Sequence, residues 1–293
     1  MKKFIVNKIA VVLINFIFIS FNVLANTDIG VIQYNVKGDT RSSHSGGVWT
    51  KPNLRDKQRQ LIQDKVDSND VDFIALEQAV TDTTSGANPL LNTLLLGKKW
   101  ITISNSEHFS NDFDEAQLTY DSDKWTLISS HSDFWIKSDA EVRPYTMGYF
   151  HLKSDASVKV LVVALHFPHL STPAWNLESF RDNVSKLVGS SDLSNVNVIL
   201  IGDMNEASTE DNINNLAGFS EMFGKFSITK IAKTCCSNSD YVYNFDQVAV
   251  NNGGDFMSSE IINSSDPDIY IPKGAPTESA ESHKAIYVQL TVN

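Results

Sequence analysis

The segment VNVILIGDMN, residues 196–205, is an apolar run that ends in two polar side chains, Asp203 and Asn205. Its aliphatic composition is typical of a strand that is buried on both faces. Asp203 and Asn205 are two positions apart, so on an extended strand both side chains point to the same side. Gly202 allows another backbone to come close. We therefore expect a buried strand that brings a carboxylate and an amide to one end of a sheet.

The same kind of ending recurs in other apolar runs along the chain. A single case has a simple explanation, because every strand must reach the surface somewhere. Repeated endings restricted to Asn, Asp, Glu, Gln and His indicate instead that several strand ends converge on one site. Besides Asp203 and Asn205, the residues concerned are Asn35, Glu77, Gln78, His166, Asp246 and His283.

These side-chain types together point to a particular chemistry. Carboxylate and amide oxygens are ligands for a hard divalent cation. Two imidazoles can transfer protons near neutral pH, and amides can bind a phosphate oxygen. The set therefore favours metal-assisted hydrolysis of a phosphate ester. His169, which follows His166 closely, is expected to lie in a loop because Pro168 separates the two.

Residues 1–25 are expected to be a signal peptide. Lys2, Lys3 and Lys8 form a basic start, an apolar run follows, and Val23 and Ala25 occupy the small-residue positions of a cleavage site. A membrane anchor is the alternative, but the run is short for a bilayer span. We expect cleavage near Ala25 and a secreted or periplasmic protein.

The mature chain, residues 26–293, is expected to form one domain without a transmembrane segment. Loss of the three lysines changes the formal net charge from −11 to −14. Such a surface repels bulk polyanions, which excludes extensive non-specific coating of DNA. It does not exclude a local cationic cleft, or a divalent metal ion that supplies positive charge.

The remaining pattern consists of many short strands with few helices. Helices are expected at 53–66 and 172–188, the second with Thr172 as N-cap and Gly189 as its end. The segment 117–136 is expected to be a hairpin or meander around Asp121–Lys124. Two sheets face to face with helical outer layers are the architecture indicated. Further strands are expected at 29–36, 71–76, 146–153, 158–167, 196–205, 243–252 and 284–292.

The chain has two cysteines, the adjacent Cys235 and Cys236. An exported protein normally oxidises its thiols, but a disulfide between neighbours closes a small and uncommon ring. The alternative, two unpaired thiols on a loop, is the one we favour from the sequence. Metal binding by this pair alone is not expected, because no Cys or His lies near them in the sequence to complete a site.

Taken in order, the motifs resemble those of the endonuclease/exonuclease/phosphatase superfamily, which has the deoxyribonuclease-I-like fold. The likeness extends over nearly the whole mature chain. The segment before the first helix, with Trp49, is also similar to the catalytic subunits of cytolethal distending toxins. The motifs are QYNV (Asn35), ALEQ (Glu77, Gln78), VRPY (Arg143), VALH (His166), GDMN (Asp203, Asn205), FDQVAV (Asp246) and ESHKAIYV (His283).

The resemblance implies an α+β fold, a four-layer αββα sandwich with its active site at one end of the two sheets. It implies Mg²⁺, or Mn²⁺ or Ca²⁺ in its place, and attack of water on a phosphodiester. By this resemblance His166 and His283 flank the scissile phosphate, and Asp246 orients His283. Asp203 and Asn205 position the phosphate and the nucleophile. The other implied roles are metal support by Asn35, Glu77 and Gln78, and phosphate binding by Arg143, for which a surface salt bridge is the alternative.

Two positions depart from the family pattern. The family has Gln followed by Glu, the Glu being a metal ligand, whereas this chain has Glu77 followed by Gln78. Neighbouring strand residues point to opposite faces, so Glu77 replaces the family's Glu only if it turns inward. The family's Ser-Asp-His is here Glu281-Ser282-His283, which removes another carboxylate.

Three functions remain open at this stage. The first is a secreted metal-dependent nuclease acting on DNA, in the setting of a toxin with partner subunits. The second is a sphingomyelinase or inositol phosphate phosphohydrolase, which acts on a phospholipid or a related phosphate ester. The third is a catalytically silent binding protein on the same scaffold. The sequence favours the first.

Overall fold

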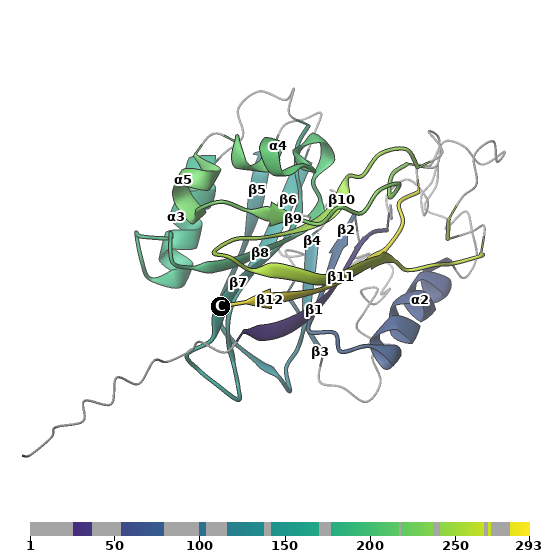
Figure 1. The fold of residues 1–293 in the computed structure, drawn as a ribbon, viewed down its shortest axis with the longest axis horizontal. Helices are drawn as coiled ribbons and strands as arrows, with labels where there is room; N and C mark the ends of the chain where they lie inside the picture. The colour runs from purple at the N-terminus through teal and green to yellow at the C-terminus, as the bar shows by residue number, and fades with distance from the viewer. Residues whose placement is uncertain are drawn as a thin grey trace, which may run out of the picture.

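The computed structural model describes residues 26–36, 54–78, 100–103, 116–137, 142–169, 177–216, 218–236, 241–266, 269–270 and 282–293. Two six-stranded sheets pack face to face, with helices on the outer sides (Figure 1). This confirms the expected αββα sandwich. The predicted signal peptide and the residues Trp49, Thr172 and Glu281 lie outside the described residues.

The first sheet contains the N-terminal and C-terminal strands of the described chain. Its central strands β1 and β2 run parallel, while β12 and β4 flank them in antiparallel orientation. In order across the sheet, the strands are β11 (Asp255–Ile261), β12 (Ile286–Val292), β1 (Thr27–Asn35), β2 (Phe73–Glu77), β4 (Ala116–Asp121) and β3 (Trp100–Ile103).

The second sheet repeats this plan. Its central strands β7 and β8 run parallel, and antiparallel neighbours flank them on both sides. In order, the strands are β5 (Trp125–Lys137), β6 (Val142–Leu152), β7 (Lys159–His166), β8 (Asn197–Asp203), β10 (Asp246–Val250) and β9 (Ser227–Ile228).

The core between the sheets is built by alternate residues of the central strands. Val31, Phe73, Val162, Ile201 and Val248 are all fully buried in one apolar cluster. The neighbouring residues on the same strands point outward to the helices, which explains why these strands are apolar on both faces. This alternation determines, for every further residue of a strand, whether its side chain faces the core between the sheets or the outer helices.

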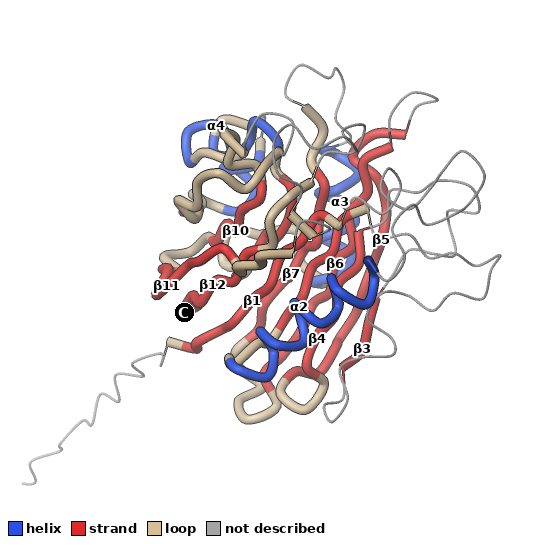
Figure 2. The backbone as a smooth tube through the Cα atoms, turned by 90° about the vertical axis from the view of Figure 1, so that its right-hand side faces the viewer, coloured by secondary structure: helices blue, strands red, loops and turns tan. Residues whose placement is uncertain are grey.

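The helices cover the two outer faces. Helix α2 (Leu54–Ser68) packs on the first sheet through Ile62 and Val66. Helices α3 (Leu177–Val188) and α5 (Phe219–Phe223) lie over the second sheet, on the opposite side of the molecule from α2 (Figure 1). Figure 2 shows α2 in front of the strands. The short helices η2 (Asn205–Ala207) and α4 (Glu210–Asn214) follow β8. No helix in the described part of the chain is long and apolar enough to span a lipid bilayer.

The predicted hairpin in residues 117–136 is wrong. The turn exists, since Lys124 N–H donates to the carbonyl oxygen of Asp121 over 3.2 Å. However, β4 before it belongs to the first sheet and β5 after it belongs to the second. Each segment has the composition of a strand, and composition reveals a strand without revealing its partner. The turn is therefore a crossover between sheets.

The other strand and helix predictions differ mainly at their ends. Gly189 has φ +75°, in the left-handed region, directly after α3, as its predicted role requires. Strand β11 was not predicted. Its residues are mostly exposed because it is an edge strand, so its sequence lacks the apolar pattern of a buried strand.

Candidate active site at the strand ends

Three predicted residues lie side by side across the second sheet. His166 ends β7, Asp203 ends β8 and Asp246 begins β10. His166 pairs in register with Asp203, and Asp203 pairs with Asp246. Each lies two positions from a residue of its own strand that faces the core between the sheets. These core residues are Ala164 on β7, Ile201 on β8 and Val248 on β10. All three side chains therefore face the first sheet.

The first sheet supplies two residues at the same end. Asn35 ends β1 and Glu77 ends β2, and the two are paired in register. Both continue inward-facing series, Asn35 after Val31 and Glu77 after Phe73 and Ala75. Both side chains are buried. The two sheets thus bring their polar strand ends together.

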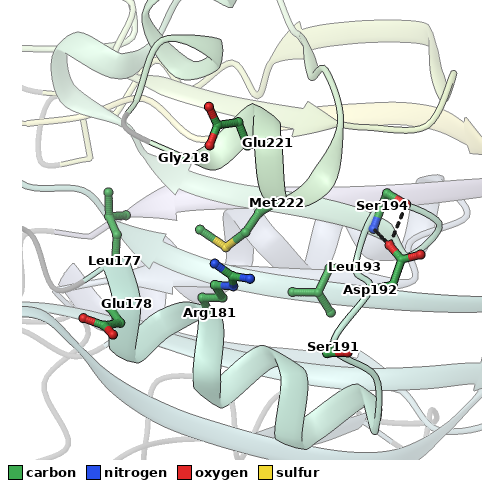
Figure 3. Close-up of a pocket in the computed structure, with 10 residues that line it drawn as sticks. All are labelled: Leu177, Glu178, Arg181, Ser191, Asp192, Leu193, Ser194, Gly218, Glu221 and Met222. Atoms are coloured by element: carbon green, nitrogen blue, oxygen red, sulfur yellow. Dashed lines mark hydrogen bonds between the residues drawn. The ribbon is translucent and has the colours of Figure 1, made fainter.

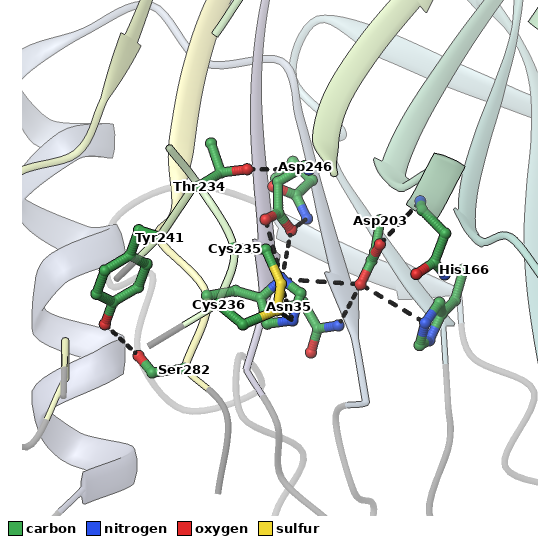
Figure 4. Close-up of a disulfide and its surroundings, with 12 residues drawn as sticks. Asn35, His166, Asp203, Thr234, Cys235, Cys236, Tyr241, Asp246 and Ser282 are labelled. Atoms are coloured by element: carbon green, nitrogen blue, oxygen red, sulfur yellow. Dashed lines mark hydrogen bonds and ion pairs between the residues drawn. A yellow bond between two sulfur atoms is a disulfide. The ribbon is translucent and has the colours of Figure 1, made fainter. Parts of the chain in front are cut away.

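Asp203 is the centre of the contacts between the sheets. Its Oδ2 accepts a hydrogen bond from Asn35 Nδ2 at 3.0 Å. The same oxygen lies 3.6 Å from His166 Nε2 (Figure 4). It also lies 3.7 Å from His283 Nδ1. One carboxylate oxygen thus faces both imidazoles, which are themselves buried.

Asp246 holds His283 in place. The Nδ1 atom of His283 is 2.9 Å and 3.1 Å from the two carboxylate oxygens of Asp246. An ionised carboxylate only accepts hydrogen bonds, so Nδ1 carries the hydrogen and Nε2 presents its lone pair. The Asp246 N–H in turn donates to Thr234 Oγ1. This pair has the carboxylate–imidazole arrangement expected of an oriented general base.

Gln33 belongs to this cluster and was missed in the sequence. Its Nε2 donates to Glu77 Oε2 at 2.7 Å and to Asp246 Oδ1 at 2.9 Å. Gln33 thus joins carboxylates from different sheets. A signal was present, because Gln33 lies two residues before Asn35 on one strand and must share its face.

The structure also answers the question of which residue of the pair Glu77-Gln78 faces the cluster. Glu77 is the last residue of β2, points between the sheets and reaches Asp246 through Gln33. Gln78 follows the strand with φ +52°, in the left-handed region, so the strand's alternation stops there. No bulge is needed for Glu77 to face inward. The inverted order therefore still brings a carboxylate to the site.

Asn205 and Arg143 lie at the same end of the second sheet. Asn205 has φ +46°, its Nδ2 donates to the carbonyl oxygen of Phe167, and its N–H donates to Asp203 Oδ1. It therefore supports the turn that carries Asp203. Arg143 is partly buried and lies at the start of β6, two residues before Tyr145. Tyr145 pairs in register with Leu165 of β7.

Ser282, at the position where the family has Asp, takes a structural role. The Tyr241 hydroxyl donates to Ser282 Oγ at 3.1 Å, and Ser282 Oγ donates to the carbonyl oxygen of Ile269 at 3.0 Å. Ser282 is fully buried. It fixes the segment that leads into His283.

The expectation of two free thiols is wrong, because Cys235 and Cys236 form a disulfide. The expectation that no ligand partner lies nearby is wrong as well. His283 Nε2 is 3.4 Å from Cys235 Sγ and 3.9 Å from Cys236 Sγ. The partner lies 47 and 48 positions away along the chain, so only the fold brings it close.

The donor set fits a hard divalent cation. Asp203, Asp246 and His283 lie close enough that one atom of each falls within 4.8 Å of the others. Since the His283 Nδ1 hydrogen is engaged by Asp246, the carboxylate oxygens are the donors for an ion. Gln33 Oε1 is also buried and accepts no hydrogen bond from the described residues. Oxygen donors of this kind suit Mg²⁺, Mn²⁺ or Ca²⁺.

A surface pocket between α3 and α5 lies away from these residues. Arg181 and Met222 lie across it from one another (Figure 3), and its carboxylates are Glu178, Asp192 and Glu221. No imidazole or thiol lines it. The chemistry expected from the sequence therefore belongs to the strand ends.

Comparison with solved structures identifies the class of fold. An endonuclease/exonuclease/phosphatase family protein from Bacteroides thetaiotaomicron matches with a TM-score of 0.62 and 15% identity, over 92% of this chain and 99% of that chain. A mannosyl-6-phosphatase from the same organism matches with a TM-score of 0.61 and 14% identity, over 89% and 99%. D. rerio TDP2, in complex with a single-strand DNA product, matches with a TM-score of 0.58 and 13% identity, over 91% and 100%.

No family model and no curated protein matches the chain by sequence. Similarity at this level of identity establishes the fold and leaves the activity open. The protein therefore has the endonuclease/exonuclease/phosphatase fold, also called deoxyribonuclease-I-like, which confirms the resemblance seen in the sequence.

Proposed function

We propose that the protein is a divalent-metal-dependent phosphodiesterase whose substrate is DNA. The observation that carries this proposal is the position of Asp203, whose Oδ2 lies within 3.7 Å of both His166 Nε2 and His283 Nδ1 at the joined ends of two sheets. Two imidazoles around one carboxylate can both accept and supply a proton. Hydrolysis of a phosphodiester needs both transfers.

In this proposal His283 is the general base. Asp246 holds its Nδ1 hydrogen, so Nε2 takes a proton from the attacking water. His166 supplies the proton for the leaving oxygen, and Asp203 Oδ2 lies 3.6 Å from its Nε2. The side of His283 that carries Nε2 also faces the disulfide, 3.4 Å from Cys235 Sγ.

The remaining residues bind and position. Asn35 and Glu77 hold the metal end of the site, with Gln33 keeping Glu77 in place. Asn205 shapes the turn beside Asp203, and Arg143 offers a cation for a phosphate oxygen. When bound, the cation supplies positive charge that stabilises the phosphate as negative charge develops on it.

Export is part of the proposal. The basic and apolar character of residues 1–25 supports removal near Ala25 and action outside the cytoplasm. An exported nuclease of this kind suits a toxin subunit that acts with partner subunits. Cleavage is tested by N-terminal sequencing of the exported protein, where an uncleaved Met1 would contradict it.

Nicking of supercoiled plasmid with Mg²⁺ tests the activity, with and without a chelator. His166→Ala should lower the rate by about 10²–10⁴-fold. His169→Ala is the matched control, because His169 pairs with Glu206 at the surface and should leave the rate unchanged. Absence of nicking at every metal concentration would refute the nuclease assignment.

The same preparation should be offered sphingomyelin and an inositol phosphate. The acidic net charge of the chain favours this alternative over long polyanions. Hydrolysis of either of these two substrates, lost in His166→Ala, with no plasmid nicking would move the assignment to that class. Binding without any hydrolysis would support a silent scaffold.

A further inference from the structure

The disulfide lies directly against a histidine of the proposed active site. Cys235 is fully buried and Cys236 is nearly so. Their sulfur atoms are 3.4 Å and 3.9 Å from His283 Nε2. Cys235 is fixed from the other side by backbone hydrogen bonds with Tyr243. Two sulfurs and one imidazole nitrogen therefore converge on one small buried volume.

The orientation of His283 suits metal ligation through Nε2. Its Nδ1 donates to the carboxylate of Asp246 at 2.9 Å, which leaves the lone pair of Nε2 directed at the sulfurs. Histidines that bind metals commonly donate their other ring N–H to a carboxylate in this way. The supporting carboxylate is thus already in place.

The spacing of the three atoms fits a tetrahedral metal ion. Zn²⁺ binds thiolate sulfur at about 2.3 Å and imidazole nitrogen at about 2.0 Å, which places the two ligand atoms roughly 3.5 Å apart. The observed distances from Nε2 to the two sulfurs are 3.4 Å and 3.9 Å. The sulfurs need only move apart from one another for an ion to enter.

We propose that Cys235, Cys236 and His283 form a binding site for a soft divalent cation such as Zn²⁺ once the disulfide is reduced. A dithiol supplies two electrons and two protons, the S–S bond breaks, each cysteine becomes a thiol, and the dithiol becomes a disulfide. On binding, both thiol protons pass to solvent. Two thiolates and Nε2 are the three protein ligands, and the fourth position is open to water.

This site selects a different metal from the one formed by the carboxylates. Thiolates favour soft ions, whereas the oxygens of Asp203 and Asp246 favour hard ions. His283 Nε2 is also the proposed general base, so a bound soft ion removes it from proton transfer. That consequence, loss of hydrolysis, rests on the proposed function; the metal site itself rests on geometry alone.

Metal titration of the reduced protein tests the site without any assay of activity. The protein is reduced with a phosphine, the reductant is removed without oxygen, and Cd²⁺ or Co²⁺ is added. We expect thiolate-to-metal charge-transfer absorbance that saturates at about one equivalent. The oxidised protein should give none. A reduced protein with no saturable absorbance would overturn the proposal.

Variants identify the ligands. Cys235→Ser, Cys236→Ser and the corresponding Ala variants should each lose the saturable absorbance, with folding checked by circular dichroism. Asp246→Asn should weaken the affinity by about 10–100-fold, as loss of a supporting carboxylate does. His169→Ala should bind as wild type does. Unchanged affinity in His283→Ala would show that the thiols bind alone and would overturn the assignment.

Inhibition is measured separately. Zn²⁺ should abolish Mg²⁺-dependent hydrolysis in the reduced protein and leave the oxidised protein and Cys235→Ser active. If no substrate is hydrolysed at all, the proposed function fails while the absorbance titration still decides the metal site. If hydrolysis occurs and saturating Zn²⁺ leaves it unchanged, the claimed link between the site and His283 is wrong.

Discussion

Strands β1 and β2 carry a buried carboxylate cluster at each end, and the two clusters have different partners. At the start of β2, Asp72 accepts hydrogen bonds from Gly30 N–H and Trp125 Nε1, both at 2.8 Å. Lys124 Nζ lies 3.2 Å from the same carboxylate. These partners join β1, β2 and the crossover into β5. The Asp72 cluster therefore holds the two sheets in register.

At the far end of the same strands, the carboxylates face groups of another kind. Asp203 and Asp246 contact the imidazoles of His166 and His283 and the amides of Asn35 and Gln33. Imidazoles exchange protons, and amides can release a carboxylate to a metal ion or a phosphate. Burial of charge is common to both ends. The two ends differ in the partners of their carboxylates. Imidazoles and amides can change partners during the proposed reaction, whereas the donors around Asp72 only hold the sheets together.

The largest effect is expected from Asp203→Asn. The amide keeps a similar shape but removes the charge that faces both imidazoles, so hydrolysis should fall by about 10²–10⁴-fold. The free energy of unfolding should also fall, by about 1–3 kcal/mol, because the amide's one acceptor oxygen cannot accept from both Asn35 Nδ2 and Asn205 N–H. Rate measurements beside urea unfolding check both. A variant that keeps its rate would show that this end is structural too.

A smaller effect is expected from the pair Glu77→Gln and Gln78→Glu. Glu77→Gln should raise the Mg²⁺ concentration needed for half-maximal activity by about 10-fold, because the inward carboxylate is lost. Gln78→Glu should give no gain, since Gln78 lies beyond the strand and a new buried charge is costly there. Titration of activity with Mg²⁺ measures both. A gain in Gln78→Glu would mean that the inverted order impairs the site.

The matching change at the other end is Asp72→Asn. The amide has one acceptor oxygen, so it cannot accept from both Gly30 N–H and Trp125 Nε1. The unfolding free energy should fall by about 1–3 kcal/mol, with hydrolysis per folded molecule unchanged. Urea unfolding followed by Trp fluorescence measures the loss. If hydrolysis falls more than stability explains, the two ends are coupled.

The smallest effect concerns pH. Burial raises the pKa of Asp72 above its ordinary value of 3.8, against the opposing effects of Gly30 N–H, the Lys124 charge and the Trp125 N–H. Between the ordinary and the raised pKa, the folded protein binds more protons than the unfolded chain. The contribution of Asp72 to stability is therefore complete below pH 3.8 and is lost as pH rises through the raised pKa.

Comparison of wild type with Asp72→Asn isolates this dependence. The unfolding free energy of wild type minus that of Asp72→Asn is measured in urea at successive acid pH values. This difference should become smaller as pH rises. A slope below about 1.4 kcal/mol per pH unit is expected, the limit for one proton. A difference that grows with pH would mean that Lys124 outweighs burial and lowers the pKa of Asp72.

Much of the fold was visible in the sequence because its signals are local. Apolar runs such as 196–205 and 158–167 predicted β8 and β7. Their polar ends predicted that His166 and Asp203 would lie where these strands end. Gly189 marked the end of α3 through its left-handed backbone. The order of the motifs then indicated the class of fold.

The tertiary structure alone decided which of these elements meet. Gln33 reaches Asp246 across 213 positions of the chain, and Cys235 meets His283 across 48. The turn at Asp121–Lys124 joins two sheets where the sequence predicted a hairpin. Periodicity gives the face of a strand, whereas pairing, register and the approach of two sheets depend on burial summed over the whole core. The sequence therefore indicated the proposed reacting groups and the ends of the strands that carry them. The packed sheets decided that Glu77 faces Asp246 through Gln33, and that a disulfide lies against His283.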